Sequence, residues 1–226
     1  GYAAPSPRAD ADAPMPPDAP PAPRPIRPPH WAAARAALRV ADPTLAAIID
    51  AVGSRALERR HDPFVSLARA IVGQQLSTAA AKTIWERVVA RAMVLTPEAI
   101  LSADRAALRA CGLSERKTDY LRTLARGFAD GDVDPAAWQA MDDEAVIEDL
   151  TRLPGIGRWT AEMFLIFHLL RPDVLPLGDV GVQRALRLHY GNGAALGPRK
   201  LARVTNPWRP WRSVATWYLW RSLDLE

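Results

Sequence analysis

The sequence predicts an all-α protein, and two observations lead to that prediction. From Trp31 onward, Ala, Leu and Arg recur at helical spacing, with few of the alternating β-branched residues that a half-buried strand needs. At four places a capping side chain stands directly before a proline, which is the arrangement of a helix start. These are Asp42-Pro43, Asp62-Pro63, Thr96-Pro97 and Asp134-Pro135.

The first 29 residues differ from the rest of the chain. They contain eleven of the 21 prolines and few apolar side chains. Proline removes backbone donors, and a segment with little apolar surface gains little by folding. We therefore expect residues 1–29 to form a disordered tail and residues 30–226 to form the folded domain.

Apolar faces at helical spacing predict the helices that follow. The helix that begins at Pro63 has such a face, and Gly73 separates it from the next helix. Later segments with an apolar face are 104–110, 115–129, 142–152, 158–170, 180–190 and 210–222.

Composition excludes several classes of protein. The chain has 24% charged residues and no apolar run near the roughly 18 residues that predict a membrane span. The single cysteine, Cys111, excludes an internal disulfide and a four-cysteine cluster or zinc site. The amino terminus also lacks an apolar signal-like run. We therefore expect a cytoplasmic protein, associated with the nucleoid if the source is bacterial.

The charge distribution favours a polyanionic partner. Residues 151–226 carry 11 Lys and Arg against 5 Asp and Glu. Such a basic segment suits nucleic acid. An ordinary solvated surface explains the charge equally well, so charge alone does not decide.

The most informative stretch is Leu153-Pro154-Gly155-Ile156-Gly157-Arg158-Trp159-Thr160-Ala161, which lies between two predicted helices. Its glycines allow a tight hairpin, and the unpaired amides at the start of the second helix suit an anion such as a DNA phosphate. An ordinary Pro-Gly turn is the alternative. Asp179 stands 20 residues after Trp159, before the predicted helix 180–190, where Asp is also a common cap.

Together these residues resemble the helix-hairpin-helix DNA glycosylase superfamily, most closely its 3-methyladenine DNA glycosylase II (AlkA-like) branch. Three segments match the pattern of that branch, namely 73–77, 155–162 and 207–213, and the resemblance covers residues 31–223. It implies a two-lobed helical bundle with the hairpin and the catalytic Asp at the mouth of a cleft. Because the chain has no room for an amino-terminal β domain, the compact form of the family is implied.

The resemblance implies a reaction for Asp179. As the catalytic carboxylate it would stabilise positive charge on the sugar and orient a water molecule. The helix dipole and the amides of Val180 and Gly181 would favour its ionised form. The implied activity is monofunctional: the enzyme flips alkylated purines, 3-methyladenine and 7-methylguanine, out of duplex DNA and excises them by hydrolysis in base excision repair, as a monomer and without a redox cofactor.

Two alternatives stay open. A glycosylase with lyase activity on oxidised bases carries a hairpin lysine that forms a Schiff base. Here Trp159 stands at that place, and the lysines are Lys82, Lys117 and Lys200. A noncatalytic hairpin module that binds DNA is the second alternative, against which the interval to Asp179 argues.

The resemblance also implies the remaining site residues. Gln75 is the wedge that fills the gap left by a flipped nucleotide, although Gln74 and Gln75 also suit a helix cap. The base pocket is formed by Trp159, Met163 and Trp220. The indoles of the two tryptophans attract a cationic base. The amides that hold a DNA phosphate belong to Gly155, Gly157 and Thr160. A structural Na+ or K+ is bound by the backbone carbonyls of Thr151, Leu153 and Ile156.

Overall fold

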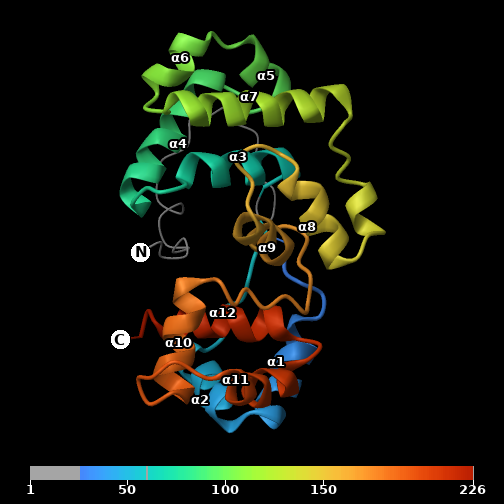
Figure 1. Cartoon of the computed structure of the whole chain (residues 1–226), viewed down its shortest axis with the longest axis vertical. Helices are drawn as coiled ribbons and strands as arrows, with labels where there is room; N and C mark the ends of the chain where they lie inside the picture. The colour runs from blue at the N-terminus through green and yellow to red at the C-terminus, as the bar shows by residue number, and fades with distance from the viewer. Residues whose placement is uncertain (1–25, 60, 226) are drawn as a thin grey trace. The chain divides into compact units, whose positions relative to one another are not determined.

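The computed structural model describes residues 26–59 and 61–225. These residues form twelve α-helices and two short 3-10 helices, and the part of the chain that is described contains no β-strand. The prediction of an all-α fold is therefore confirmed. None of the helices described here is both long and apolar enough to cross a membrane. The chain divides into two compact units, one built from both ends of the chain and the other from residues 61–174 (Figure 1).

The first unit is organised around its last helix. Its α-helices are α1 (Trp31–Ala41), α2 (Pro43–Val52), α10 (Val180–Tyr190), α11 (Pro198–Thr205) and α12 (Arg212–Ser222). Every residue of α12 from Ser213 to Ser222 is buried, and the helix packs against α1, α2 and α10. A helix that is buried on all sides lies in the core of its unit.

A buried carboxylate, Asp42, ties three elements of this unit together. Its Oδ1 accepts hydrogen bonds from the amides of Thr44 and Leu45, which caps α2. Its Oδ2 accepts from the hydroxyl of Tyr190 on α10 and from the indole of Trp208, each at 2.8 Å. Trp208 belongs to the 3-10 helix Asn206–Trp208. Burial and the neighbouring charge of Asp42 raise the pKa of Tyr190.

The second unit is built around α3 and α7. Its α-helices are α3 (Pro63–Gly73), α4 (Thr78–Ala92), α5 (Pro97–Ser102), α6 (Arg105–Ala110), α7 (Glu115–Asp130), α8 (Asp143–Thr151) and α9 (Arg158–Phe167), with the 3-10 helix Ala137–Gln139 between α7 and α8. The long helix α7 packs against α3, α5 and α6, and α3 also contacts α4 and α9.

Three of the four predicted proline starts are helix starts. Asp42, Asp62 and Thr96 are the N-caps of α2, α3 and α5, with the proline at the first helical position. The prediction for Asp134 is wrong. Its carboxylate accepts from the amide of Ala136 in a turn, and only the 3-10 helix follows.

Two further differences concern the end of one helix and the presence of another. The predicted segment 158–170 is too long, because α9 ends at Phe167 and Leu170 has a left-handed φ of 56°. Helix α11 was not predicted; it begins with Pro198 after Gly197, which offers no side-chain cap.

The tail predicted for residues 1–29 extends too far. Ile26 forms an antiparallel bridge with Arg59, and Arg27 pairs with Glu58 at 3.1 Å. Pro28 is buried, and His30 stacks on Trp211. Residues 26–29 therefore belong to the folded part, because contacts with distant residues order this proline-rich stretch. The predicted tail up to residue 25 lies outside the described residues.

Candidate active site

Asp179 is a buried carboxylate in the first unit. It is the N-cap of α10 and is only 6% exposed. Its Oδ1 accepts hydrogen bonds from the amide of Val182 and from the indole Nε1 of Trp220, both at 2.8 Å. The amide that donates is that of Val182, the third residue of α10, whereas the sequence suggested the amides of Val180 and Gly181. A cap side chain commonly accepts from the third amide of its helix. A negative charge here is held by two donors and the helix dipole.

Gly181 leaves the room that this pair requires. A Cβ at this position would lie 3.1 Å from both Asp179 Oδ1 and Trp220 Cδ1. Trp220 itself is 3% exposed. It was predicted as a pocket aromatic, and its hydrogen bond to Asp179 was not anticipated. The two residues are 41 positions apart, and no signal in the sequence indicated this bond.

Two apolar side chains beside Asp179 are exposed. Leu177 is 43% exposed and Val180 is 59% exposed. From the sequence, only the backbone amide of Val180 was considered, and neither side chain was assigned a role. The only indication in the sequence that these side chains belong to the site was their position next to the proposed carboxylate.

The hairpin lies in the second unit, between α8 and α9. The amide of Ile156 donates to the carbonyl of Leu153 at 3.0 Å, and the Ile156 side chain is buried. Gly155 has a φ of +89°, and a Cβ there would overlap the ring of Tyr120. Both the backbone conformation and this close approach therefore require glycine at position 155.

Gly157 differs from Gly155. Its backbone is extended, with φ −94°, and a Cβ would meet no other described atom within 4 Å. The fold of the described residues thus gives no reason for glycine here. An open glycine at a helix start lets a partner approach the backbone closely.

The start of α9 carries no side-chain cap. Gly157 is its N-cap, whereas α10 is capped by Asp179. The first residue of α9, Arg158, pairs with Glu144 of α8 at 2.5 Å and with Glu162 at 3.1 Å. The pair with Glu144 joins the two helices of the hairpin, whereas Glu162 stands on α9 itself, and both carboxylates raise the pKa of Arg158. The first-turn amides, that of the buried Thr160 included, suit an anion.

The predicted pocket residues on α9 share one face. Trp159 and Met163 are half-buried and stand one turn apart. Phe167, one further turn along, is half-buried as well and was missed. The spacing of four residues was visible in the sequence and could have identified it.

Gln75 lies exposed in the turn between α3 and α4, with a left-handed φ of 56°. Such a φ is strained for a residue other than glycine. The cap of α4 is Ser77, whose Oγ accepts from the amide of Ala80. No capping bond of Gln75 is found among the described residues. Its neighbour Gln74 donates from Nε2 to the carbonyl of Gly155 at 2.6 Å, so the structure brings this turn to the hairpin.

The three carbonyls predicted to hold a cation lie within six consecutive residues, from the end of α8 into the hairpin. The carbonyl of Leu153 accepts the amide of Ile156. Within the described part of the chain, no hydrogen bond is made to the carbonyl oxygens of Thr151 or Ile156. These neutral carbonyl oxygens are the kind of ligand that a monovalent cation takes, so the three residues fit such an ion.

A separate open hollow of about 320 Å³ lies on the second unit, lined by α7, α8 and the start of the hairpin. Its wall carries charges of both signs, including Asp149 and Arg152. Of the predicted site residues, only Leu153 lines it. Because its wall is charged and contains none of Trp159, Met163 and Trp220, this hollow is not the base pocket predicted from the sequence.

Comparison with known proteins gives a consistent picture. The model of a family described as HhH-GPD superfamily base excision DNA repair protein matches residues 68–210. DNA-3-methyladenine glycosylase 1 of Schizosaccharomyces pombe is 36% identical over 179 residues, which are 76% of this chain and 77% of the yeast protein.

Solved structures agree with these matches. A 3-methyladenine DNA glycosylase of S. pombe in complex with abasic DNA has a TM-score of 0.75 and 32% identity, covering 85% of this chain and 97% of that one. A DNA-3-methyladenine glycosidase of Bacillus halodurans has a TM-score of 0.75 and 37% identity, covering 88% of this chain and 92% of that one.

Proposed function

Because the chain belongs to the HhH-GPD superfamily of base excision DNA repair proteins, we propose that it is a monofunctional DNA glycosylase that excises alkylated purines from duplex DNA. Its substrates are 3-methyladenine and 7-methylguanine. The enzyme takes the damaged nucleotide out of the base stack and hydrolyses its glycosidic bond.

The observation that carries this proposal is the buried carboxylate of Asp179, held by the Val182 amide and the Trp220 indole. As the glycosidic bond breaks, positive charge develops on the sugar. A fixed negative charge beside C1′ stabilises that transition state without reorganising first. The same carboxylate orients the water that attacks C1′, and the base leaves with the bonding electron pair.

The substrate class is supported by the names of the relatives and by the α9 face. Both solved structures named above are 3-methyladenine glycosylases or glycosidases more than 30% identical to this chain. An alkylated purine is cationic, and an indole face attracts a cation. We assign Trp159 and Met163 to the base pocket, with Phe167 as a further wall. Within the first unit, we assign Trp220 the role of orienting Asp179, to which its indole donates a hydrogen bond.

The lysines support hydrolysis without a lyase step. The hairpin position that would need a lysine holds Trp159. Lys82 stands on the exposed face of α4, and Lys200 on α11. The ammonium of Lys117 donates to two backbone carbonyls. Borohydride treatment of the enzyme on duplexes with alkylated bases and on duplexes with oxidised bases should therefore trap no covalent complex, and a trapped complex would establish the lyase alternative.

The proposed reaction needs water but no redox cofactor. A Na+ or K+ held by the carbonyls of Thr151, Leu153 and Ile156 would keep the hairpin in shape and would take part in no chemical step. The amides of Gly155, Gly157 and Thr160 would hold a DNA phosphate. We propose that the enzyme acts as a monomer in the cytoplasm.

The test is chromatographic identification of the bases released from methylated duplex DNA. The wild-type enzyme should release 3-methyladenine and 7-methylguanine. Asp179→Asn keeps the shape and the capping ability of the side chain, since Asn is also a good N-cap. It should lose about 100-fold in excision rate because the charge is removed.

The matched control is Asp142→Asn. Asp142 caps α8 as Asp179 caps α10, accepting from the amide of Ala145 at 2.9 Å. This variant should excise at the wild-type rate. Near-wild-type release by Asp179→Asn would contradict the assigned role, and DNA binding without release of any base by the wild-type protein would favour the noncatalytic module.

A further inference from the structure

Helix α7 contacts both turns to which DNA contacts have been assigned. The Lys117 ammonium donates to the carbonyls of Val72 and Gln74, each at 2.7 Å. These carbonyls lie at the end of α3, directly before Gln75. One turn further along α7, the ring of Tyr120 lies so close to Gly155 that no side chain fits there. Lys117 therefore holds the Gln75 turn, and Tyr120 supports the hairpin.

A third contact joins the end of α3 directly to the hairpin. The side-chain amide of Gln74 donates to the carbonyl of Gly155 at 2.6 Å. The end of α3, the hairpin and α7 thus contact one another in pairs. Because each pair is joined directly, movement of one turn relative to the other has to break at least one of these contacts.

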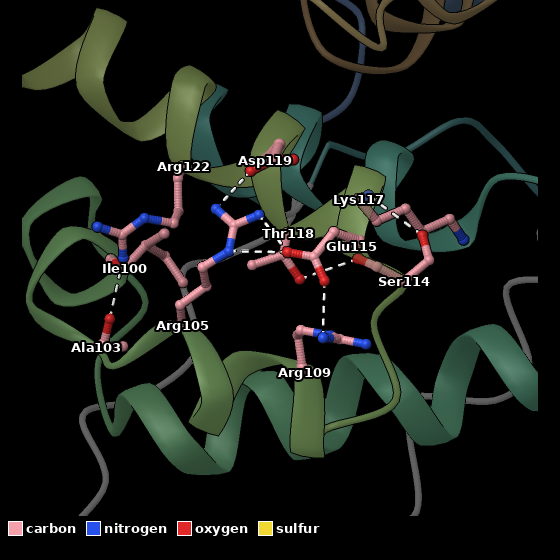
Figure 2. A network of polar contacts seen from close by, with 10 residues as sticks. All are labelled: Ile100, Ala103, Arg105, Arg109, Ser114, Glu115, Lys117, Thr118, Asp119 and Arg122. Carbon is pink, nitrogen blue, oxygen red and sulfur yellow. Dashed lines mark hydrogen bonds and ion pairs between the residues drawn. The ribbon is translucent and has the colours of Figure 1, made fainter.

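Helix α7 is itself well anchored on its other side. Arg105 of α6 pairs with Glu115 and Asp119 at 2.5 Å (Figure 2). Arg122 donates to the carbonyl of Ile100 in α5 and to that of Ala103 directly after this helix. Surface ion pairs contribute little individually, but here they act together with packing against α3 and α5. The helix can therefore serve as a fixed support.

The position of Lys117 is unusual for a lysine. The side chain is half-buried, and burial lowers its pKa. Lysine normally keeps its ammonium in water. Here the ammonium gives up water contacts and bonds two carbonyls beside the strained φ of Gln75. Strained backbone persists only where the surroundings hold it in place.

We propose that Lys117 and Tyr120 are positioning residues that hold the Gln75 turn and the hairpin in a fixed relation, so that the wedge enters the duplex in register with the phosphate bound by the hairpin. The proposal rests on the proposed function, because it takes Gln75 as the wedge and the hairpin as the phosphate site. Neither Lys117 nor Tyr120 needs to contact DNA.

The test measures selectivity as well as stability. Affinities are compared for a duplex with an abasic-site analogue and for the same duplex undamaged, together with the melting temperature. Lys117→Met keeps an unbranched side chain that is shorter by one atom and removes the donors. Because each lost hydrogen bond changes an equilibrium by about threefold to tenfold, the abasic-to-undamaged affinity ratio should fall at least threefold.

Arg116→Met is the matched control. It removes the same charge from the neighbouring exposed position of α7. A lost phosphate contact would weaken binding to both duplexes alike, so this variant should leave the ratio unchanged. In a double-mutant cycle, Lys117→Met combined with Gln75→Ala should lower the ratio no further than Gln75→Ala alone, because Lys117 acts through Gln75.

The outcomes separate the two proposals. If Gln75→Ala lowers the ratio while a folded Lys117→Met leaves it unchanged, the positioning role is overturned and the glycosylase stands. Additive effects in the double variant overturn it as well. If Gln75→Ala itself leaves the ratio unchanged, the wedge and its positioning both fail, whereas release of methylated bases by the wild-type enzyme still tests the reaction. Should Lys117→Met not fold, Gln74→Met breaks the link to Gly155 and must lower the ratio.

Discussion

The indole Nε1 of Trp220 donates to Oδ1 of Asp179 at 2.8 Å, so the final helix of the chain orients the proposed catalytic carboxylate. The amide of Val182 bonds to the same oxygen. With two donors on one oxygen, the carboxylate plane is fixed relative to both α10 and α12. Preorganised charge of this kind is what stabilises a developing cation most effectively.

Trp220→Phe should slow excision while leaving DNA binding nearly unchanged. The substitution keeps an aromatic ring but removes the donor to a charged group, a bond that contributes about 1.5–3 kcal/mol. We expect a fall of about tenfold or more in the single-turnover rate on methylated duplex. The control is Trp208→Phe, which removes an indole donor from a different buried carboxylate, that of Asp42. That variant should melt earlier but retain its single-turnover rate at a temperature where it is folded.

The two hairpin glycines should respond differently to alanine. Gly155→Ala places a Cβ against Tyr120 at a left-handed φ and should cost about 2 kcal/mol or more of stability. Gly157→Ala meets no described atom and should leave the melting temperature unchanged. It should nevertheless weaken binding to duplex DNA, because the added methyl group obstructs a phosphate at the amides. Unchanged binding of Gly157→Ala would argue against the phosphate site.

Gln75→Gly should make the protein more stable and less selective. Glycine adopts the φ of 56° without strain, so unfolding should cost about 1 kcal/mol more than in wild type. Without a side chain the turn cannot fill the gap in the base stack. The abasic-to-undamaged affinity ratio should fall as it does in Gln75→Ala, which keeps the strain. Thermal melting and titration of both duplexes check the two halves of the prediction, and an unchanged ratio in Gln75→Gly would rule out the wedge.

Two truncations should differ in stability. Removal of residues 1–25 keeps the bridge between Ile26 and Arg59 and should leave the melting temperature and excision nearly unchanged. Removal of residues 1–29 deletes that bridge, the Arg27–Glu58 pair and the buried Pro28. The longer truncation should lower the melting temperature by about 4 °C, the shift expected for a loss of 1–2 kcal/mol in a chain of this size. Equal melting temperatures would show that residues 26–29 contribute no stability.

The sequence by itself determined most helix starts. Asp42, Asp62 and Thr96 each cap the helix predicted for them. A cap depends on a side chain and amides two or three residues away, so its signal is local. The spacing of the hairpin and Asp179 also identified the family, because both motifs are short and contiguous.

Only the tertiary structure decided which distant groups meet. It placed Trp220 against Asp179, Lys117 beneath the turn of Gln75, and Tyr190 and Trp208 on Asp42. It also ordered Ile26 through a partner 33 positions away and left Asp134 at a turn. Such contacts form between residues that a one-dimensional pattern does not relate. They arise only when the burial of helix faces sets how the helices pack, and packing then decides which buried polar groups must satisfy one another.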